Sequence, residues 1–549
     1  MSMSQDGERS AELLEEIRQL LELNGENPFK VRAFEKAQGV VSGCSDLKKR
    51  AQAGTLTELD GVGKGIAEVL TEFLLKGQST VRDDLKSKLP AGLLDLVQIP
   101  GLGPKKAKQL IEELGIQSIG ELEYACRENR LLKLKGFGEK IQAKILEGIR
   151  FRQSTQDQAR IVEAEPAAQA LSAHLKKSLG SSVRVELTGA LRRKLEIVDR
   201  FEFLIEEPKS GAATTRSKAQ EALDSFLKKN PAVLKTFLHF STADQFGYEW
   251  AKTTGSEAHW KVLGSPASFS VKTEEEFYSK LKLPWIAPEL RETGEEVAFA
   301  KKGSLEKLLP QDGIVGVFHN HTNQSDGTAT LEEMVEAARA LGYRYIGISD
   351  HSQTAVYAHG LKTDDLKEQE KAVRKLQEKY DDIRIFWGVE SDILADGELD
   401  YSTAQLKRFD FVVASIHSRF KMDRDQMTTR LLKAVRNPAT RFLGHMTGRL
   451  LLGRPGYEFD TEKVIEEAKK CDVAIEINAN PARLDIDWRW GTKLRAEGTL
   501  VSVNPDAHEV EGLKDTAYGV TVARKALLPK TQVINSREVK EVEKWLSRK

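Results

Sequence analysis

The stretch "GIVGVFHNHTNQSDG", residues 313–327, decides how the C-terminal half of this chain is interpreted. An apolar run leads into His319 and His321, and Asp326 follows after a short loop. Because alternate residues of a strand point the same way, both histidines reach one cavity. The stretch therefore predicts a buried strand whose carboxyl end carries side chains able to bind a metal ion.

The same order of apolar strand, loop and amphipathic helix repeats from about residue 312 to the end of the chain. The further strand-like segments are "YRYIGISDH" (343–351), "IRIFWGVES" (383–391), "FDFVVASIH" (409–417), "TRFLGHMT" (440–447), "VAIEINAN" (473–480) and "TLVSVNPDAH" (499–508). Alternating strands and helices at this spacing favour a parallel β/α architecture. Polar residues gather at the carboxyl end of each strand, where the active site of a β/α barrel lies.

These strand ends offer imidazole and carboxylate groups in a regular series. The candidate metal ligands are His319, His321, Asp326, His351, Glu390, His417, His445, Asp506 and His508. Mixed nitrogen and oxygen ligands suit Mn, Zn or Fe. Nine ligands exceed the need of one ion, so we expect two or three divalent ions. Isolated polar residues at a barrel rim are the alternative, and the ordered series favours the metal cluster.

The pattern resembles the PHP (polymerase and histidinol phosphatase) family, over roughly residues 312–549. The resemblance implies a distorted barrel of seven strands and a trinuclear metal centre. It assigns Glu390 to the bridging carboxylate. Two arginines of "GHMTGRLLLGRPG", Arg449 and Arg454, are candidates to hold substrate phosphate, because guanidinium groups suit phosphate oxygens. Both fit equally well as surface charges.

The first 150 residues are expected to be helical, and they carry a repeated Gly-x-Gly pattern. It occurs in "LTELDGVGKGIAEVLTEFLLKG" (56–77), "LVQIPGLGPKKAKQLIEELGI" (96–116) and "LLKLKGFGEKIQAKILEGI" (131–149). The glycines allow a tight turn with φ > 0 and leave amide N–H groups at a helix N-terminus, which favours phosphate binding. Three helix-hairpin-helix copies predict DNA-backbone binding rather than ordinary helical hairpins. The candidate DNA contacts are Gly61, Gly63, Lys64, Gly101, Gly103, Lys105, Lys106, Gly136, Gly138 and Lys140.

The N-terminal 300 residues resemble bacterial family X DNA polymerases. The resemblance rests on "NPFKVRAFEKA", on the three hairpin segments, on "FGYEWAKTTGSEAH" and on "LPWIAPELRE". It implies a lyase-like helical domain over 1–85, a fingers-like helix-hairpin-helix domain over 86–152, and an α+β nucleotidyltransferase-like palm and thumb over 153–300, followed by the PHP domain over 312–549. The family's Schiff-base lysine aligns with Val69, which has no amine.

The catalytic strand of the palm departs from the family pattern. In "LTGALRRKLEIVDRFEFLIEE" (187–207), the serine that holds the triphosphate aligns with Ala190, and the first two catalytic aspartates align with Arg200 and Glu202. The third carboxylate aligns with Phe237. Since two-metal phosphoryl transfer needs clustered carboxylates, the resemblance implies that this site has lost polymerase activity.

Bulk composition limits the remaining possibilities. The 549 residues carry no net charge, so DNA contacts must use local patches. Cys44, Cys126 and Cys471 are scattered, as in a reducing cytoplasm, and no apolar run suits a membrane span. Seven of the ten histidines lie between His319 and His508, so we place the chemistry there.

We therefore expect a cytoplasmic, nucleoid-associated, monomeric phosphoesterase. It would act on gapped, nicked or 3′-ended DNA in repair, as a 3′→5′ exonuclease, 3′-end-processing or abasic-site nuclease. A residual template-directed polymerase with a proofreading PHP domain, a small-molecule phosphatase and a non-catalytic DNA-binding scaffold are the alternatives.

Overall fold

The computed structural model describes residues 5–42, 46–59, 61–89, 92–97, 99, 102–153, 158–230 and 233–547. The chain divides into two compact units, Met1–Leu122 and Glu123–Lys549. None of the described helices is both long and apolar enough to cross a membrane.

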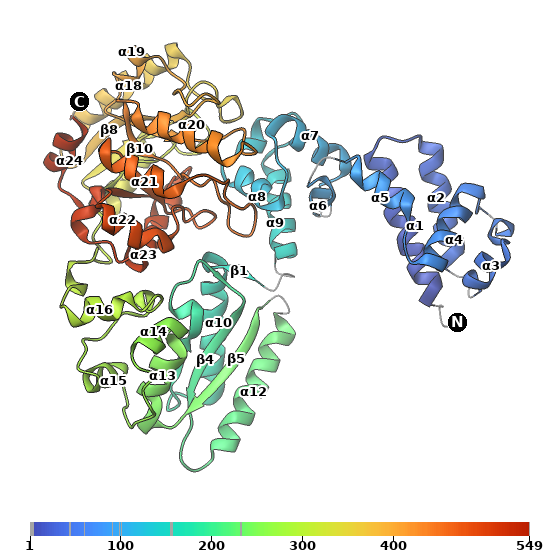
Figure 1. Ribbon diagram of the computed structural model, residues 1–549, viewed down its shortest axis with the longest axis horizontal. Coiled ribbons are helices and arrows are strands. Elements are labelled where there is room, and N and C mark those ends of the chain that lie inside the picture. Colours follow the sequence, from blue (N-terminus) through green and yellow to red (C-terminus); the bar gives the residue numbers. More distant parts are fainter. Residues whose placement is uncertain are drawn as a thin grey trace. The chain divides into compact units, whose positions relative to one another are not determined.

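The described part of the first unit is helical (Figure 1). Its helices are α1 (Gln5–Leu23), α2 (Pro28–Ser42), α3 (Leu47–Ala53), α4 (Lys64–Lys76), α5 (Thr80–Ser87), α6 (Leu93–Val97) and α7 (Pro104–Leu114), and α8 (Ile119–Arg127) crosses into the second unit. The apolar faces of α1 to α4 share one core, in which Leu14, Ile17 and Leu70 are fully buried. Because α2, α3 and α4 have 15 residues or fewer, packing of these faces rather than helix propensity holds the bundle together.

The second unit begins with helical elements and continues into a small α+β layer that includes the predicted palm. The helical elements are the 3-10 helix η2 (Arg130–Lys133), α9 (Glu139–Gln153), α10 (Ile161–Leu179), α11 (Gly189–Arg192) and α12 (Ala212–Lys229). The strands are β1 (Ala159–Arg160), β2 (Val185–Thr188), β3 (Ile197–Val198), β4 (Arg200–Glu206) and β5 (Lys235–Ser241). The sheet order is β2-β4-β5, with β2 antiparallel and β5 parallel to β4. Four short helices follow: α13 (Phe246–Thr254), α14 (Glu257–Val262), α15 (Glu274–Lys280) and α16 (Glu295–Lys301).

The last part of the chain forms the predicted parallel barrel. Its seven strands, β6 (Gly316–Val317), β7 (Tyr345–Ile348), β8 (Arg384–Asp392), β9 (Phe411–Ser415), β10 (Thr440–Leu443), β11 (Ala474–Asn478) and β12 (Val501–Asn504), lie in sequence order in one sheet. A bridge between Asn320 and Ala507 joins the two edges, so the barrel is nearly closed. The helices are α17 (Leu331–Ala340), α18 (Thr363–Lys379), α19 (Thr403–Leu406), α20 (Arg424–Arg436), α21 (Thr461–Lys470), α22 (Gly491–Glu497), α23 (Thr516–Lys525) and α24 (Val539–Leu546).

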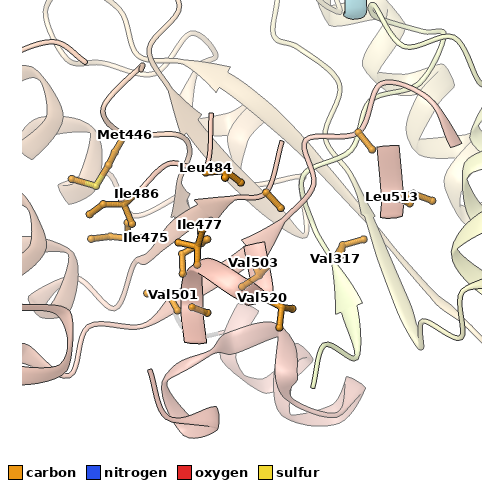
Figure 2. Packing of buried hydrophobic residues seen from close by; sticks show 14 of the residues in the cluster. Val317, Met446, Ile475, Ile477, Leu484, Ile486, Val501, Val503, Leu513 and Val520 are labelled. Carbon is orange, nitrogen blue, oxygen red and sulfur yellow. The ribbon is translucent and has the colours of Figure 1, made fainter. Parts of the chain in front are cut away.

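Alternation along the strands turns one set of apolar residues outward against the helices and the intervening residues inward. Figure 2 shows Ile475 and Ile477 of β11 beside Val501 and Val503 of β12, with Val520 of α23 against them. The residues between them, Glu476, Ser502 and their neighbours, point the opposite way. The alternation that packs apolar strand residues against the helices therefore also turns Glu476 and Ser502 towards the centre of the barrel.

The barrel interior below these polar residues is filled by aromatic rings. The Phe318 ring lies 4.8 Å from that of Phe442 and 5.3 Å from that of Phe411, and Trp545 of α24 lies 5.4 Å from Phe442. Gly388 makes room for this layer, since a Cβ there would lie 2.3 Å from the Phe411 ring. The filled end leaves the carboxyl ends of the strands as the place for a site.

Candidate metal centre and DNA-binding segments

All nine predicted ligand side chains lie together at the carboxyl ends of the barrel strands. Four overlapping groups have ligand atoms within 4.8 Å of one another: His321, Asp326, His351 and His508; His319, Glu390 and His445; His319, His321 and Asp506; and His351, Glu390 and His417. Among the described residues, these groups contain the nine side chains and no others. Eight of the nine residues are buried, and His417 is half-buried.

Glu390 is the central carboxylate of the cluster, near the end of β8. Its Oε1 lies 3.0–3.3 Å from three imidazole Nε2 atoms, those of His445, His417 and His319. Its Oε2 lies 3.0 Å from Nδ1 of His351 and 3.6 Å from Nε2 of His321. One carboxylate thus faces two different sets of imidazoles, the arrangement that a group bridging two ions needs.

Further carboxylates lie behind the histidines, and the sequence reasoning missed them. Oε1 of Glu476 lies 2.7 Å from Nδ1 of His319, and Oδ1 of Asp392 lies 2.6 Å from Nδ1 of His417. Such a contact holds Nδ1 in the protonated form and makes Nε2 the nitrogen that could bind a metal. A signal was present, because Asp392 follows Glu390 by two positions on the same strand, and so points the same way.

The electrostatics of the cluster depend on these pairings. Burial raises the pKa of Glu390, but the facing imidazoles of His417 and His319 outweigh it and hold the pKa well below its usual range. Burial, followed by the charges of His508 and His351, lowers the pKa of His321 to about 4. At His508, by contrast, burial lowers the pKa, but the facing carboxylates of Asp326 and Glu128 outweigh it and raise the pKa to about 9. The cluster thus combines carboxylate oxygens with imidazole nitrogens, the donor types that a divalent transition metal accepts.

Several buried nitrogen and oxygen atoms of the cluster lack a hydrogen-bond partner among the described residues and could bind a metal ion. Nε2 of His319, both ring nitrogens of His321, Oδ2 of Asp326 and Nε2 of His508 have no hydrogen-bond partner among the described residues. Buried polar groups are normally satisfied, and leaving them unpaired costs about 1–3 kcal/mol each. Divalent ions would give these atoms partners. They would also balance the negative charges of the three carboxylates among the ligands, Asp326, Glu390 and Asp506.

The two predicted phosphate-binding arginines are engaged by neighbouring loops. Arg449 donates from Nε to the Arg483 carbonyl at 2.9 Å and is paired with Asp487. Arg454 donates to the Gly448 carbonyl at 2.8 Å. The arginine nearest to a predicted ligand on this side is Arg483, which is 3% exposed and whose Nε lies 3.7 Å from Oδ2 of Asp506. Sequence reasoning passed over Arg483, although it follows shortly after the end of β11.

The sheet of β2, β4 and β5 carries the side chains that the sequence comparison aligned with the carboxylates of a polymerase site. Arg200 and Glu202 alternate on β4, and Phe237 of β5 pairs with Glu202 in register. Arg200 is joined to Asp199 by two contacts of 2.9 and 2.7 Å, and Oε2 of Glu202 lies 2.9 Å from His239. Ala190 lies in α11. In the described part of this layer, no three His, Cys, Asp or Glu side chains lie close enough to hold a metal ion.

The adjacent palm arginines are paired with carboxylates of the chain itself. Arg192 makes contacts of 2.7 and 2.6 Å with Glu274, and Arg193 lies 3.1 Å from Glu292. Glu274 also binds Arg291, and both of these side chains are buried. These arginines tie the palm to the helices that follow it.

The three predicted hairpins adopt related conformations where they are described. Gly61 and Gly136 have φ of 80° and 88°, while Gly63 and Gly103 have φ of −75° and −74° and are the N-caps of α4 and α7. The expected positive φ therefore holds for the first glycine of each described pair and not for the second. Gly101 lies outside the described residues.

The second glycines leave open space in front of a helix N-terminus. A Cβ built at Gly63, Gly103 or Gly138 would meet no atom within 4 Å. Lys64, Lys105 and Lys140 are exposed, and Lys106 is half-buried. Open amide groups beside lysines suit a phosphate backbone.

Comparisons with known proteins agree with this layout. A helix-hairpin-helix domain profile matches residues 7–79, a SAM-like helix-hairpin-helix tandem profile matches residues 93–150, and a PHP domain profile matches residues 318–480. The "DNA polymerase/3'-5' exonuclease PolX" of Bacillus subtilis (strain 168) is 35% identical over 565 residues, which cover 98% of each chain. The chain belongs to the bacterial PolX family.

Other relatives of this PolX-family chain match a smaller part of it. A "Probable phosphatase" of Caldicellulosiruptor saccharolyticus is 34% identical over 170 residues, 29% of this chain and 64% of the relative. A probable phosphatase of Caldanaerobacter subterraneus subsp. tengcongensis is 27% identical over 250 residues, 42% of this chain and 90% of the relative. The PolX relative, by contrast, is matched along both halves.

Proposed function

We propose that this PolX-family chain is a metal-dependent nuclease that removes nucleotides from DNA 3′ ends in repair. The buried cluster of nine ligand side chains around Glu390 carries the proposal. In the reaction, water adds to the phosphorus of the terminal phosphodiester, the P–O3′ bond breaks, and a 5′ mononucleotide leaves a shortened strand with a 3′ hydroxyl. Trimming of damaged 3′ ends and abasic-site cleavage use the same bond chemistry.

The chain's own residues have distinct parts in this proposal. The nine clustered side chains would hold two or three Mn, Zn or Fe ions, and Glu390 would bridge two of them. When bound, the ions would activate the attacking water and stabilise the leaving oxygen. Glu476 and Asp392 orient His319 and His417. Arg449 or Arg454 would neutralise the phosphate only after giving up its present carbonyl contacts. Arg483 lies nearer to the ligands, but it is buried and is engaged with Tyr124 and Asp506.

We propose that the N-terminal half supplies DNA binding without polymerisation. The helical domains 1–85 and 86–152 would bind DNA. The palm and thumb, 153–300, would serve as a scaffold, and the PHP domain, 312–549, would cleave the strand. On the palm face an arginine and a phenylalanine stand at two of the three carboxylate positions, and the arginine is itself a cation. Such a face lacks the clustered carboxylates that hold the Mg²⁺ ions of nucleotide transfer. Gapped or nicked DNA is the expected substrate, and a monomer in the cytoplasm is the expected form.

A phosphomonoesterase is the second candidate, because two of the relatives are named probable phosphatases. They match 29% and 42% of this chain. The helix-hairpin-helix segments favour DNA as the substrate over a small phosphomonoester. The test uses protein treated with EDTA and then supplied with Mn²⁺, and offers a 5′-labelled oligonucleotide or p-nitrophenyl phosphate. We expect a shortening ladder with Mn²⁺, none with EDTA, and loss of the ladder in Glu390→Gln. Rapid hydrolysis of p-nitrophenyl phosphate with an intact oligonucleotide would favour the second candidate.

A further inference from the structure

One segment of the helix-hairpin-helix region, residues 123–133, lies against the candidate metal centre. The Tyr124 hydroxyl lies 3.1 Å from Oδ2 of Asp506. Oε1 of Glu128 lies 3.7 Å from Nε2 of His508, and Nε of Arg130 lies 3.8 Å from Oδ2 of Asp326. Three of the nine candidate ligands, Asp506, His508 and Asp326, therefore each face a side chain of this segment. The segment is distant from these ligands in sequence, by 382 positions between Tyr124 and Asp506.

The contact at Asp506 divides the two oxygens of its carboxylate. Oδ1 faces the imidazoles, at 3.2 Å from Nε2 of His321 and 3.4 Å from Nε2 of His319. Oδ2 accepts hydrogen bonds from Tyr124 at 3.1 Å and from Nδ2 of Asn478 at 3.0 Å. The oxygen on the ligand side is thus oriented by bonds made to the other oxygen, which is how a group behind a metal ligand acts.

The segment is anchored to the barrel by further contacts. The Tyr124 hydroxyl accepts a hydrogen bond from Nε of Arg483 at 3.0 Å, and the Arg483 guanidinium lies 4.2 Å from the centre of the Tyr124 ring. The ring packs with Leu450 and Ala482. Lys133 donates from Nζ to the Ser325 carbonyl at 2.6 Å, directly before Asp326 in the chain. These contacts fix the segment at both ends.

We propose that Tyr124, Glu128 and Arg130 are positioning residues for the metal centre, and that metal binding and docking of residues 123–133 are coupled. The proposal deepens the proposed function and rests on its metal site. Because linkage is reciprocal, docking of the segment strengthens metal binding, and metal binding strengthens docking to the same degree.

The segment also connects two parts of the proposed activity. It lies within the matched helix-hairpin-helix tandem and leads directly into the third hairpin, with Gly136 and Gly138. DNA held at this hairpin would therefore contact the element that supports Asp506 and Asp326. The third hairpin and the cleavage site would then act as one unit.

The first experiment measures Mn²⁺ affinity by titration calorimetry on the full metal-free chain. Tyr124→Phe removes only the hydroxyl, and we expect about tenfold weaker Mn²⁺ binding. Glu128→Gln should weaken binding in the same direction. Tyr248→Phe is the matched control, because its hydroxyl donates to the Pro266 carbonyl at 2.9 Å in another part of the chain, and it should bind Mn²⁺ as the wild type does. Equal affinity of wild type and Tyr124→Phe would overturn the proposal.

The second experiment is decided by the wild type, so a variant that misfolds cannot determine its outcome. Amide hydrogen exchange of the wild type is followed over residues 123–134, with and without Mn²⁺. We expect Mn²⁺ to slow exchange in this segment, and to slow it less in Tyr124→Phe. If Mn²⁺ binds and exchange in the segment stays the same, the coupling is refuted while the metal site stands. If the wild type binds no Mn²⁺, the proposed function fails together with the coupling.

Discussion

The Nδ1 atom of His319 lies 2.7 Å from Oε1 of Glu476, and both side chains are fully buried. The Glu476 carboxylate is itself held by side-chain amides of Asn478 and Asn504, each at 3.1 Å. This chain of contacts turns Nε2 of His319 towards Glu390. A carboxylate that touches no substrate thereby determines which nitrogen is offered to a metal ion.

Replacing Glu476 by Gln keeps the shape of the side chain and removes its charge. We expect Mn²⁺ affinity to fall about 10- to 100-fold, because the imidazole becomes less basic and less firmly oriented. Activity should be lost at limiting Mn²⁺ and recover in part at high Mn²⁺. Glu462→Gln, on an exposed position of α21, is the control. A Glu476→Gln protein with wild-type Mn²⁺ affinity would show that the contact has no part in metal binding.

The helix-hairpin-helix segments predict DNA binding that depends on salt. Reversing the charge of two exposed hairpin lysines, in Lys64→Glu/Lys140→Glu, should weaken binding to gapped DNA of any sequence. Each lost phosphate contact should make the slope of log K against log[salt] shallower by about 0.9. Lys218→Glu, exposed on α12, should leave the slope unchanged. An unaltered slope in the double variant would place the DNA elsewhere.

Glu274 predicts a pH dependence of stability. Burial raises its pKa, but Arg291 and Arg192 outweigh burial and lower the pKa to about 2, from 4.5. A lowered carboxyl pKa stabilises the fold above pH 4.5, by about 3 kcal/mol in this case, and the contribution is lost as the pH falls from 4.5 towards 2. In urea unfolding, Glu274→Gln should be less stable than the wild type at pH 7, and the difference should shrink at pH 3. A difference that stays constant with pH would rule out this ion pair as the cause.

The pairing of Arg200 with Asp199 on the palm sheet predicts that this sheet takes no part in catalysis. Among the described residues, Glu202 belongs to no group of three His, Cys, Asp or Glu side chains that could hold a metal ion. Glu202→Gln should therefore leave Mn²⁺-dependent shortening of a primer unchanged. Primer extension by the wild type that disappears in Glu202→Gln would reveal a working polymerase site instead.

The barrel and its cluster were predictable from the sequence because strand periodicity alone places alternate residues on one side. His319 and His321 belong together on that ground, and parallel strands bring the other strand ends to the same rim. The palm positions came instead from the resemblance to family X polymerases, and the structure pairs two of them, Glu202 and Phe237, on neighbouring strands.

The groups behind the ligands were harder to predict because they depend on tertiary contacts. Tyr124 reaches Asp506 across 382 positions of sequence, and no local pattern distinguishes it from an ordinary core tyrosine. Arg449 and Arg454 were chosen for their chemistry and proximity in sequence, whereas Arg483 lies beside Asp506 because of the course of a loop. The conformation of the hairpins differed in one respect, since an extended N-cap glycine needs no positive φ.

The most direct test follows one 5′-labelled primer on a gapped template with Mn²⁺, with and without deoxynucleotides. The wild type is compared with the His319→Ala/His321→Ala variant, which keeps the palm intact. We predict that the primer shortens whether or not nucleotides are present, and that the variant leaves it at full length. A primer that lengthens when nucleotides are added, or that still shortens in the variant, would contradict the assignment of activity to the barrel alone.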